Sequence, residues 1–314
     1  MTPSVAAYLE QALAKNTQNS YRSGWSAFTR FCSSHHIPLW PIHEDTLLHF
    51  FASLADKHLR HGTLKVYVSA IAFHAKLFGH AVDTPTMHRL HYLLMGIRRS
   101  QAGWLTKPLR KPITTYHMVA LRAFLKANYP PHDARMLWAA CTAAFFGLLR
   151  SSEYTCPTTV TVNPGTLCYH HIIIQPDGSR ASLYLPLSKN DQFGRGVSIY
   201  LFPLPSRLCP VSALIHFVRA RHNLQGPFFI FNDGTHLTRE HIVNILRSAF
   251  PNQRELNTHS FRIGGASALS DAGVQDHVIQ IMGRWSSDSF LRYIHIPVES
   301  LREFQRSMAI HKHM

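Results

Sequence analysis

Acidic residues are scarce in this chain of 314 residues. It has 17 Asp and Glu against 32 Lys and Arg, which gives a formal net charge of +15 and a pI near 9.9. Such an excess of positive charge is typical of a protein that binds a polyanion, most often nucleic acid. The chain is no disordered basic tail, because its 46% hydrophobic content is enough to bury substantial cores. Its length leaves room for two domains of ordinary size.

Several other protein classes lack their signatures here. The five cysteines are odd in number and form no CxxC pair, which argues against zinc fingers and a disulfide framework and suits a reducing compartment. There is no Walker loop and no GxGxxG motif. None of the 23 histidines has the spacing of metal ligands, so the sequence predicts no metal site. The first residues lack the pattern of a signal peptide, and no apolar run reaches the roughly 18 residues of a transmembrane span. We therefore expect no membrane association.

The region 16–100 has the apolar spacing of helices alone. The stretch TQNSYRSGWSAFTRFCSSH places five apolar side chains on one helical face, Tyr21, Trp25, Phe28, Phe31 and Cys32. The stretches EDTLLHFFASLADK and GTLKVYVSAIAFHAKLFG predict two more helices. Thr84 as N-cap and Pro85 at the first helical position predict the fourth. Residues 1–100 are therefore predicted to form a four-helix bundle.

The remaining chain mixes helices with a few strands. A glycine, two prolines and three cations in SQAGWLTKPLRKP predict a basic linker over residues 101–112. LCYHHIIIQ and ASLYLPLSK are β-rich runs separated by the turn signal PDGSR, and GVSIYLF predicts a third strand. Residues 113–298 are thus predicted to form an α+β domain with a small antiparallel sheet, and 299–314 a C-terminal helix. The expected fold class is mainly α, in two domains.

One stretch, THSFRIGGAS, has the features of an anion site. Thr258 is a good N-cap, so a helix is expected to begin at His259, and Arg262 then lies on the same face one turn later. The free N–H groups and the dipole of a first helical turn favour an anion. The small residues 264–267 let another backbone pack closely. The alternative is an ordinary helix start with a packed histidine and a surface arginine.

The order of further cations and aromatic residues resembles a known family. The boxes GLLRSSE, HSFRIGGAS and MGRWSSDSFLRYI resemble those of tyrosine recombinases (phage-integrase-like proteins). The matched positions are Arg150, Lys189, His259, Arg262, Trp285 and Tyr293. The sequences SKNDQFGRG and LCPVSAL are most similar to those of eukaryotic mobile-element members, the Crypton and DIRS-like groups. Trp285 and Tyr293 are eight apart where nine is common, and Trp stands where His is commoner.

The resemblance implies a fold and an activity. It implies a DNA-clamping core-binding domain over 1–100 and a catalytic domain over 113–298. The implied activity is site-specific recombination of double-stranded DNA through a 3′-phosphotyrosyl intermediate, by subunits that assemble on DNA as dimers and tetramers. No cofactor is needed, because the phosphotyrosyl bond conserves the energy of the broken bond. A nuclear location is implied for a eukaryotic host, and otherwise a cytoplasmic one.

The resemblance also assigns roles to the matched residues. Tyr293 is the implied nucleophile, and Arg150 and Arg262 are the donors that stabilise charge on the phosphate. Lys189 is the implied acid for the leaving 5′ oxygen. The remaining two residues assist: Trp285 donates one more hydrogen bond, and His259 assists or helps take the proton of the tyrosine.

Other assignments stay open at this stage. Lys107 and Arg195 are alternatives to Lys189 as the cation near the phosphate, and Glu153 is interpreted as orienting Arg150 rather than as catalytic. The candidate DNA contacts are Lys65, Arg98, Arg99, Lys107, Arg110, Lys111 and Arg284. The segment 299–314 either contacts a neighbouring subunit or folds back on its own domain.

Two other functions compete with recombination. One is a type IB-like topoisomerase. The small size of the chain and its predicted core-binding domain argue against that function. The other is a DNA-binding protein derived from a recombinase that no longer cleaves DNA. Such a protein is expected to lack one or more catalytic groups, and all six are present here.

Overall fold

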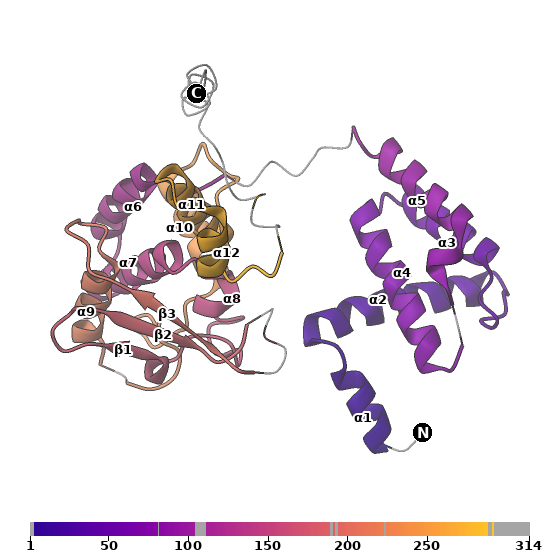
Figure 1. Ribbon diagram of the computed structural model, residues 1–314, viewed down its shortest axis with the longest axis horizontal. Helices are drawn as coiled ribbons and strands as arrows, with labels where there is room; N and C mark the ends of the chain where they lie inside the picture. The colour runs from indigo at the N-terminus through magenta and orange to yellow at the C-terminus, as the bar shows by residue number, and fades with distance from the viewer. Residues whose placement is uncertain are drawn as a thin grey trace, which may run out of the picture. The chain divides into compact units, whose positions relative to one another are not determined.

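The chain divides into two compact units. The computed structural model describes residues 3–80, 82–103, 111–188, 191, 194–222, 224–287 and 291. The first unit comprises residues 1–107 and the second residues 108–314 (Figure 1).

The described part of the first unit is helical. Its elements are α1 (Pro3–Gln11), α2 (Lys15–Ser34), α3 (Glu44–Asp56), α4 (His61–Leu77), the 3₁₀ turn η1 (Thr84–Thr86) and α5 (His88–Ser100). Helix α2 packs on α4, and α3 packs on α5. The face predicted for α2 does point inward: Phe28 and Cys32 are buried, and Trp25 and Phe31 pack against the same core. Aromatic contacts join the helices, with the rings of Phe28 and Phe50 5.3 Å apart.

Two details of this unit differ from the sequence prediction. Helix α1 was not predicted. The last helix also begins later than expected, because Thr84 and Pro85 belong to η1 and α5 begins only at His88. The carbonyl of Asp83 accepts hydrogen bonds from both the backbone N–H and the hydroxyl of Thr86, which closes a tight turn. The backbone of Met87 (ψ 82°) then separates this turn from α5.

The second unit is built around α7. Its elements are α6 (Thr115–Asn128), α7 (Pro131–Phe146), α8 (Ser151–Tyr154), η2 (Tyr169–His171), β1 (Ile172–Ile174), β2 (Ala181–Leu185), β3 (Val197–Leu201), α9 (Pro210–Ala220), α10 (Arg239–Ala249), α11 (Thr258–Asp271) and α12 (Asp276–Gly283). Helix α7 packs against α6, α9 and α11. Its alanines allow this close approach, since Ala139, Ala140, Ala143 and Ala144 are all fully buried. The result is a helix enclosed on nearly every side, whose end leads directly into the candidate site.

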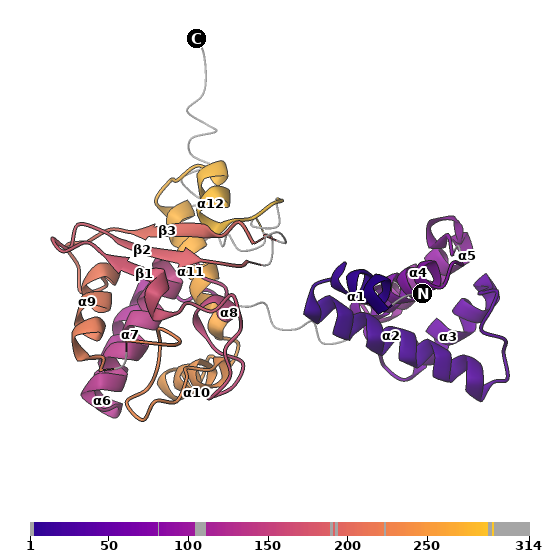
Figure 2. The same cartoon turned by 90° about the horizontal axis from the view of Figure 1, so that it is seen from below.

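The predicted sheet is confirmed. The three strands are antiparallel in the order β1-β2-β3, and Leu183 of β2 pairs with Ile172 and Ile199. The turn between β1 and β2 forms locally, because a carboxylate oxygen of Asp177 accepts hydrogen bonds from the N–H and hydroxyl of Ser179. Alternate residues of β2 are buried in the same core as α7 and α9, beside which the sheet lies (Figure 2).

Candidate active site

The turn after α7 positions the first arginine of the candidate site. Leu148 adopts a left-handed backbone conformation (φ 47°), which is unfavourable for a residue with a Cβ. Burial of its side chain, only 1% exposed, offsets that cost. The turn directs the carbonyl groups of Gly147 and Leu148 toward the arginines described below. It also places Arg150 at the N-cap of α8.

The start of α11 differs by one residue from the prediction. The N-cap is Asn257 and not Thr258, because the side chain of Asn257 accepts a hydrogen bond of 2.9 Å from the N–H of His259. Thr258 is the first helical residue and is buried. His259 is half-buried in the first turn, one turn before Arg262.

The glycines of α11 explain its close packing. A Cβ on Gly264 would overlap the backbone of Ile113, and one on Gly265 would overlap the carbonyl of Phe145 at the end of α7. The close backbone approach predicted for these small residues is therefore confirmed. It fixes the helix that carries Arg262 against the helix that leads to Arg150.

Arg262 is the most deeply buried cation of the site. Its side chain is largely hidden, with the residue 1% exposed. Its guanidinium donates hydrogen bonds to the carbonyl oxygens of Leu148 and Gly283. The ring of Trp285 covers one face of this guanidinium, with 4.2 Å from Cζ to the ring centroid. Such a contact stabilises a desolvated cation.

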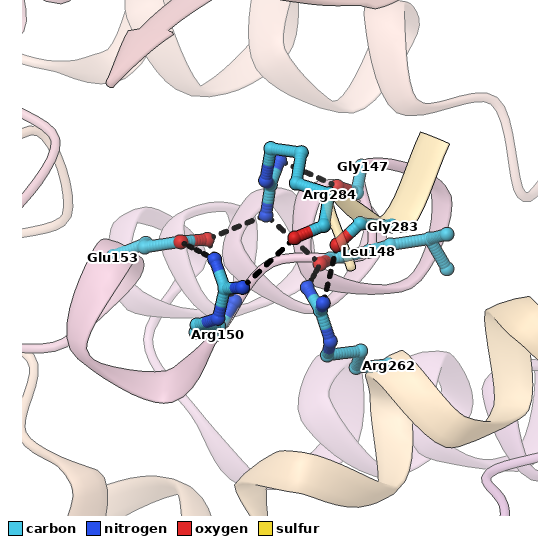
Figure 3. A network of polar contacts seen from close by, with 7 residues as sticks. All are labelled: Gly147, Leu148, Arg150, Glu153, Arg262, Gly283 and Arg284. Atoms are coloured by element: carbon cyan, nitrogen blue, oxygen red, sulfur yellow. Dashed lines mark hydrogen bonds and ion pairs between the residues drawn. The ribbon is translucent and has the colours of Figure 1, made fainter. Parts of the chain in front are cut away.

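Glu153 holds two further arginines in place (Figure 3). This carboxylate is buried, at 2% exposed. Its Oε1 accepts a hydrogen bond of 3.0 Å from Nη1 of Arg150, and its Oε2 accepts one of 2.8 Å from the backbone N–H of Arg150. Oε2 also accepts a hydrogen bond of 2.8 Å from Nη2 of Arg284. The orienting role predicted for Glu153 thus has a direct geometric basis.

The arginines converge on one short segment of main chain. Nη2 of Arg150 donates to the carbonyl of Arg284 over 3.2 Å, and Arg262 donates to the carbonyl of Gly283, the preceding residue. Two of the three guanidinium groups, those of Arg150 and Arg284, pair with the carboxylate of Glu153, whereas that of Arg262 donates to main-chain carbonyls only (Figure 3). This cluster carries an excess of positive charge and many hydrogen-bond donors, which suits an oxyanion.

Arg284, which the sequence suggested as a DNA contact, has a largely buried side chain in the structure. Its side chain is only 11% exposed, and it donates hydrogen bonds to Glu153 and to the carbonyl of Leu148. Burial lowers the pKa of Arg284, while Glu153 counteracts that shift and Arg150 adds to it. Sequence reasoning missed this internal role. No local pattern signals this role, because Arg284 and its partner Glu153 are 131 residues apart in the sequence.

The remaining predicted residues lie in three different settings. Lys189, Tyr293, Lys107 and Arg110 are outside the described residues. The candidate DNA contacts of the first unit, Lys65, Arg98 and Arg99, are exposed on helices. Lys111 is also exposed, and its ammonium group pairs with Glu255 over 2.5 Å.

Two further residues, the alternative cation Arg195 and the tyrosine Tyr154, have distinct environments. Arg195 is exposed, and its backbone N–H donates to a carboxylate oxygen of Asp191. Tyr154, the nearest tyrosine to Arg150 in the sequence, is 1% exposed, and burial raises its pKa well above the ordinary value. A buried phenol of raised pKa is a poor nucleophile at neutral pH.

Among the described residues, no group of His, Cys, Asp and Glu side chains could hold a metal ion. No helix in the described ranges has both the length and the apolar character needed to cross a membrane.

Solved structures of DNA recombinases resemble this chain, although no family model and no curated protein matches it. XerH site-specific recombinase, in a post-cleavage complex with its palindromic difH substrate, has a TM-score of 0.63 at 14% identity, over 93% of this chain and 80% of that one. The Tn1549 transposon integrase in complex with transposon right end DNA has a TM-score of 0.59 at 12% identity, over 95% of both chains. A lambda integrase dimer bound to a COC′ core site has a TM-score of 0.56 at 14% identity, over 90% of this chain and 72% of that one. At these identities the likeness establishes the fold.

Proposed function

We propose that the chain is a tyrosine recombinase, which cleaves and rejoins DNA strands at specific sites. The observation that carries this proposal is the convergence of Arg150 and Arg262, distant in sequence, on the adjacent carbonyls of Gly283 and Arg284. The fold of DNA-bound recombinases and integrases supports the same activity. So does the order of the sequence boxes, which places Tyr293 shortly after the segment on which the arginines converge.

The carbonyl oxygens of Gly283 and Arg284 indicate where phosphate oxygens would bind. A phosphodiester is anionic, and charge-assisted hydrogen bonds to it are stronger than those to a neutral carbonyl. Arg150 and Arg262 would therefore exchange a carbonyl for a non-bridging phosphate oxygen. Glu153 keeps Arg150 in a fixed orientation, so that its donors are already aligned when charge develops in the transition state.

The proposed chemistry uses the side chains of this chain alone. The Tyr293 hydroxyl oxygen forms a bond to phosphorus while the bond from phosphorus to the 5′ oxygen breaks. The proton of the tyrosine passes to His259 or to water, and the ammonium group of Lys189 gives a proton to the leaving 5′ oxygen. A 5′ hydroxyl from another strand then attacks the phosphotyrosyl bond, and the same proton transfers run in reverse. The numbers of bonds made and broken are equal in each step.

Covalent capture from random-sequence DNA tests this proposal and identifies the target sequence in the same experiment. The chain is incubated with a pool of random-sequence DNA duplexes that carry nicks, then denatured, and DNA linked to protein is isolated and sequenced. We expect adducts with a common sequence from the wild-type chain and none from Tyr293→Phe, which should still bind DNA. Adducts that persist in Tyr293→Phe would reassign the nucleophile, and no adducts from either chain at any sequence would reject the proposal.

We also propose that the protein serves a mobile element of eukaryotic type and acts in the nucleus of such a host. This proposal is supported by the resemblance of the sequences SKNDQFGRG and LCPVSAL to those of eukaryotic mobile-element recombinases. Captured sequences that match the ends of a repeated genomic element would agree with this origin. Captured sequences that occur once, at a chromosome-resolution site, would contradict it.

Recombination of two duplexes needs two cutting subunits per duplex and four in the synapse. We propose that residues 299–314, which lie outside the described residues, link neighbouring subunits. Pro297 can open a helix in which Leu301, Phe304 and Met308 share one stripe. Deletion of 299–314 should abolish tetrameric synapses on captured DNA and retain single-site binding. Tetramers formed by a folded truncated chain would exclude this role.

A further inference from the structure

A basic cavity of about 500 Å³ lies between α6, α7 and the start of α9. Its walls come from two separate stretches of the second unit, residues 122–138 and 206–216. Both ribbon views place α6 and α9 on the side of this unit away from α8, the helix that begins after Arg150 (Figures 1 and 2). Volumes of about 300–1,000 Å³ are usual for sites that bind small molecules. The cavity is thus large enough for a ligand and distinct from the candidate active site.

Among the described residues that line this cavity, four are cations and none is a carboxylate. Arg122 and Lys126 lie one turn apart on α6, Arg135 lies on α7, and Arg207 precedes α9. None of these four takes part in an ion pair with any described residue. Like charges around one cavity repel each other, and an anion bound between them offsets this repulsion. The unneutralised charge therefore favours an anionic ligand with several charges.

Hydrogen-bond donors and an aromatic wall accompany the charge. The guanidinium of Arg122 lies over the ring of Trp138, with Cζ 5.8 Å from the centroid. Its Nε is enclosed and has no hydrogen-bond partner among the described residues, although buried donors are normally paired. Ser206 and Ser212 also line the cavity, and the Ser206 hydroxyl oxygen accepts a hydrogen bond from the N–H of Leu208, which leaves its O–H as a donor. A planar guanidinium and hydroxyl donors match the oxygens of a phosphate group.

We infer that this cavity binds a small soluble compound with a polyphosphate group, such as a nucleoside triphosphate. Four cations match the charge of a polyphosphate better than that of a single carboxylate. The rings of Tyr129 and Trp138 supply apolar walls for an organic part of the ligand. The concave shape suits a small molecule, whereas the DNA backbone follows extended grooves.

Isothermal titration of the full chain with ATP and with inorganic tripolyphosphate tests the inference. We expect saturable binding at one site, and a loss of about tenfold to a hundredfold in affinity for each charged donor removed. The first variant is Arg122→Ala with Arg207→Ala. The second is Lys126→Ala with Arg135→Ala. Both side chains are exposed, so this variant should fold even if the first does not. The control is Arg247→Ala, an exposed arginine of α10 outside the cavity, which should bind as the wild type does.

Three outcomes would overturn the inference. Equal affinity in the cavity variants and in Arg247→Ala would show that the probes bind the basic surface without selection. Displacement of the probe by duplex DNA, with weaker DNA binding in the cavity variants, would make the cavity part of the DNA surface. Binding of polyglutamate at this cavity, with no binding of ATP or tripolyphosphate, would assign it to an acidic peptide.

Discussion

The candidate DNA contacts of the first unit and the arginines at the candidate site of the second unit are placed in opposite ways. In the first unit Lys65, Arg98 and Arg99 are exposed on helices around an aromatic core. In the second unit Arg150, Arg262 and Arg284 have side chains that are mostly buried, and they donate hydrogen bonds to Glu153 and to main-chain carbonyls. Exposed, mobile cations add affinity for a polyanion but fix no atom in place, whereas buried and hydrogen-bonded ones hold donors at set positions. If the proposed function is right, we therefore expect the exposed cations to supply affinity for DNA and the buried ones to act in the chemistry.

The largest expected effect is that of salt on DNA affinity, which depends on the exposed cations. A chain that neutralises 6–10 phosphates should lose about 10³–10⁵ in affinity between 50 and 200 mM salt, because the released counterions return to the DNA. The cleavage rate of DNA that is already bound should change much less, since the buried arginines are screened less by salt. Fluorescence anisotropy and single-turnover cleavage at several salt concentrations measure the two quantities. A flat affinity curve would contradict a clamp by exposed cations.

Loss of the Glu153 charge should have the next largest effect, on stability. Glu153→Gln keeps the size of the side chain and leaves Arg150 and Arg284 without their shared counter-charge. Breaking a buried ion pair by removal of one partner costs about 3–5 kcal/mol. Urea unfolding of the second unit should show this loss. Glu240→Gln, an exposed residue of α10, is the control and should change stability by no more than about 0.5 kcal/mol. Equal effects in both variants would show that the buried pairs add little.

Substitution of a site arginine should affect cleavage more than binding. Arg150→Ala removes a donor whose side chain is 17% exposed, and Arg262→Lys keeps the charge but not the two parallel donors. Each should lower the single-turnover cleavage rate by roughly 10²–10³, as removal of one transition-state donor does elsewhere. DNA affinity should change only a few-fold, because many other phosphate contacts remain. Lost binding with an unchanged cleavage rate of bound DNA would reverse the assignment.

Local features of this fold could be predicted from the sequence, and those that depend on distant partners could not. The hairpin of β1 and β2 was predictable, since Asp177 and Gly178 specify the turn within a few residues. The pairing of Arg150 with Glu153 was predictable for the same reason of short range. Even so, local patterns misplaced the starts of α5 and α11, where a 3₁₀ turn and Asn257 take over the expected roles.

The convergence of the arginines was beyond sequence reasoning. It depends on the left-handed backbone conformation of Leu148 and Arg284. Neither residue is a glycine, so the sequence gives no indication of this conformation at either position. It also depends on carbonyl groups, which every residue carries and which therefore leave no mark in a sequence. The site residues were found through a resemblance to a family, and the structure adds the geometry that the resemblance did not contain.

The smallest expected effect concerns a single exposed cation of the first unit. The pKa of His61 lies below its ordinary value of 6.5, chiefly through burial and then through the charges of Arg98 and Lys65. The folded unit therefore prefers neutral His61. The stability gained in this way is present above the ordinary pKa and is lost as pH falls through the lower folded value. Arg98→Ala should raise the pKa of His61 part of the way back, because burial and Lys65 remain. The pH range over which stability is lost, between the folded pKa and 6.5, should therefore become narrower.

The same substitution should change DNA binding only slightly. Loss of one phosphate contact should reduce the salt slope by about 0.9, with no effect on the cleavage rate of bound DNA. An NMR titration of the His61 ring gives the pKa, and anisotropy gives the slope. Arg99→Ala is the matched control: its side chain is also exposed and adjacent in sequence but is not among the causes of the His61 shift. It should leave the pKa of His61 unchanged. A rise of the same size in both variants would show that the pKa of His61 responds to net charge in general and not to Arg98. An altered cleavage rate in Arg98→Ala would contradict the separate roles expected for exposed and buried cations.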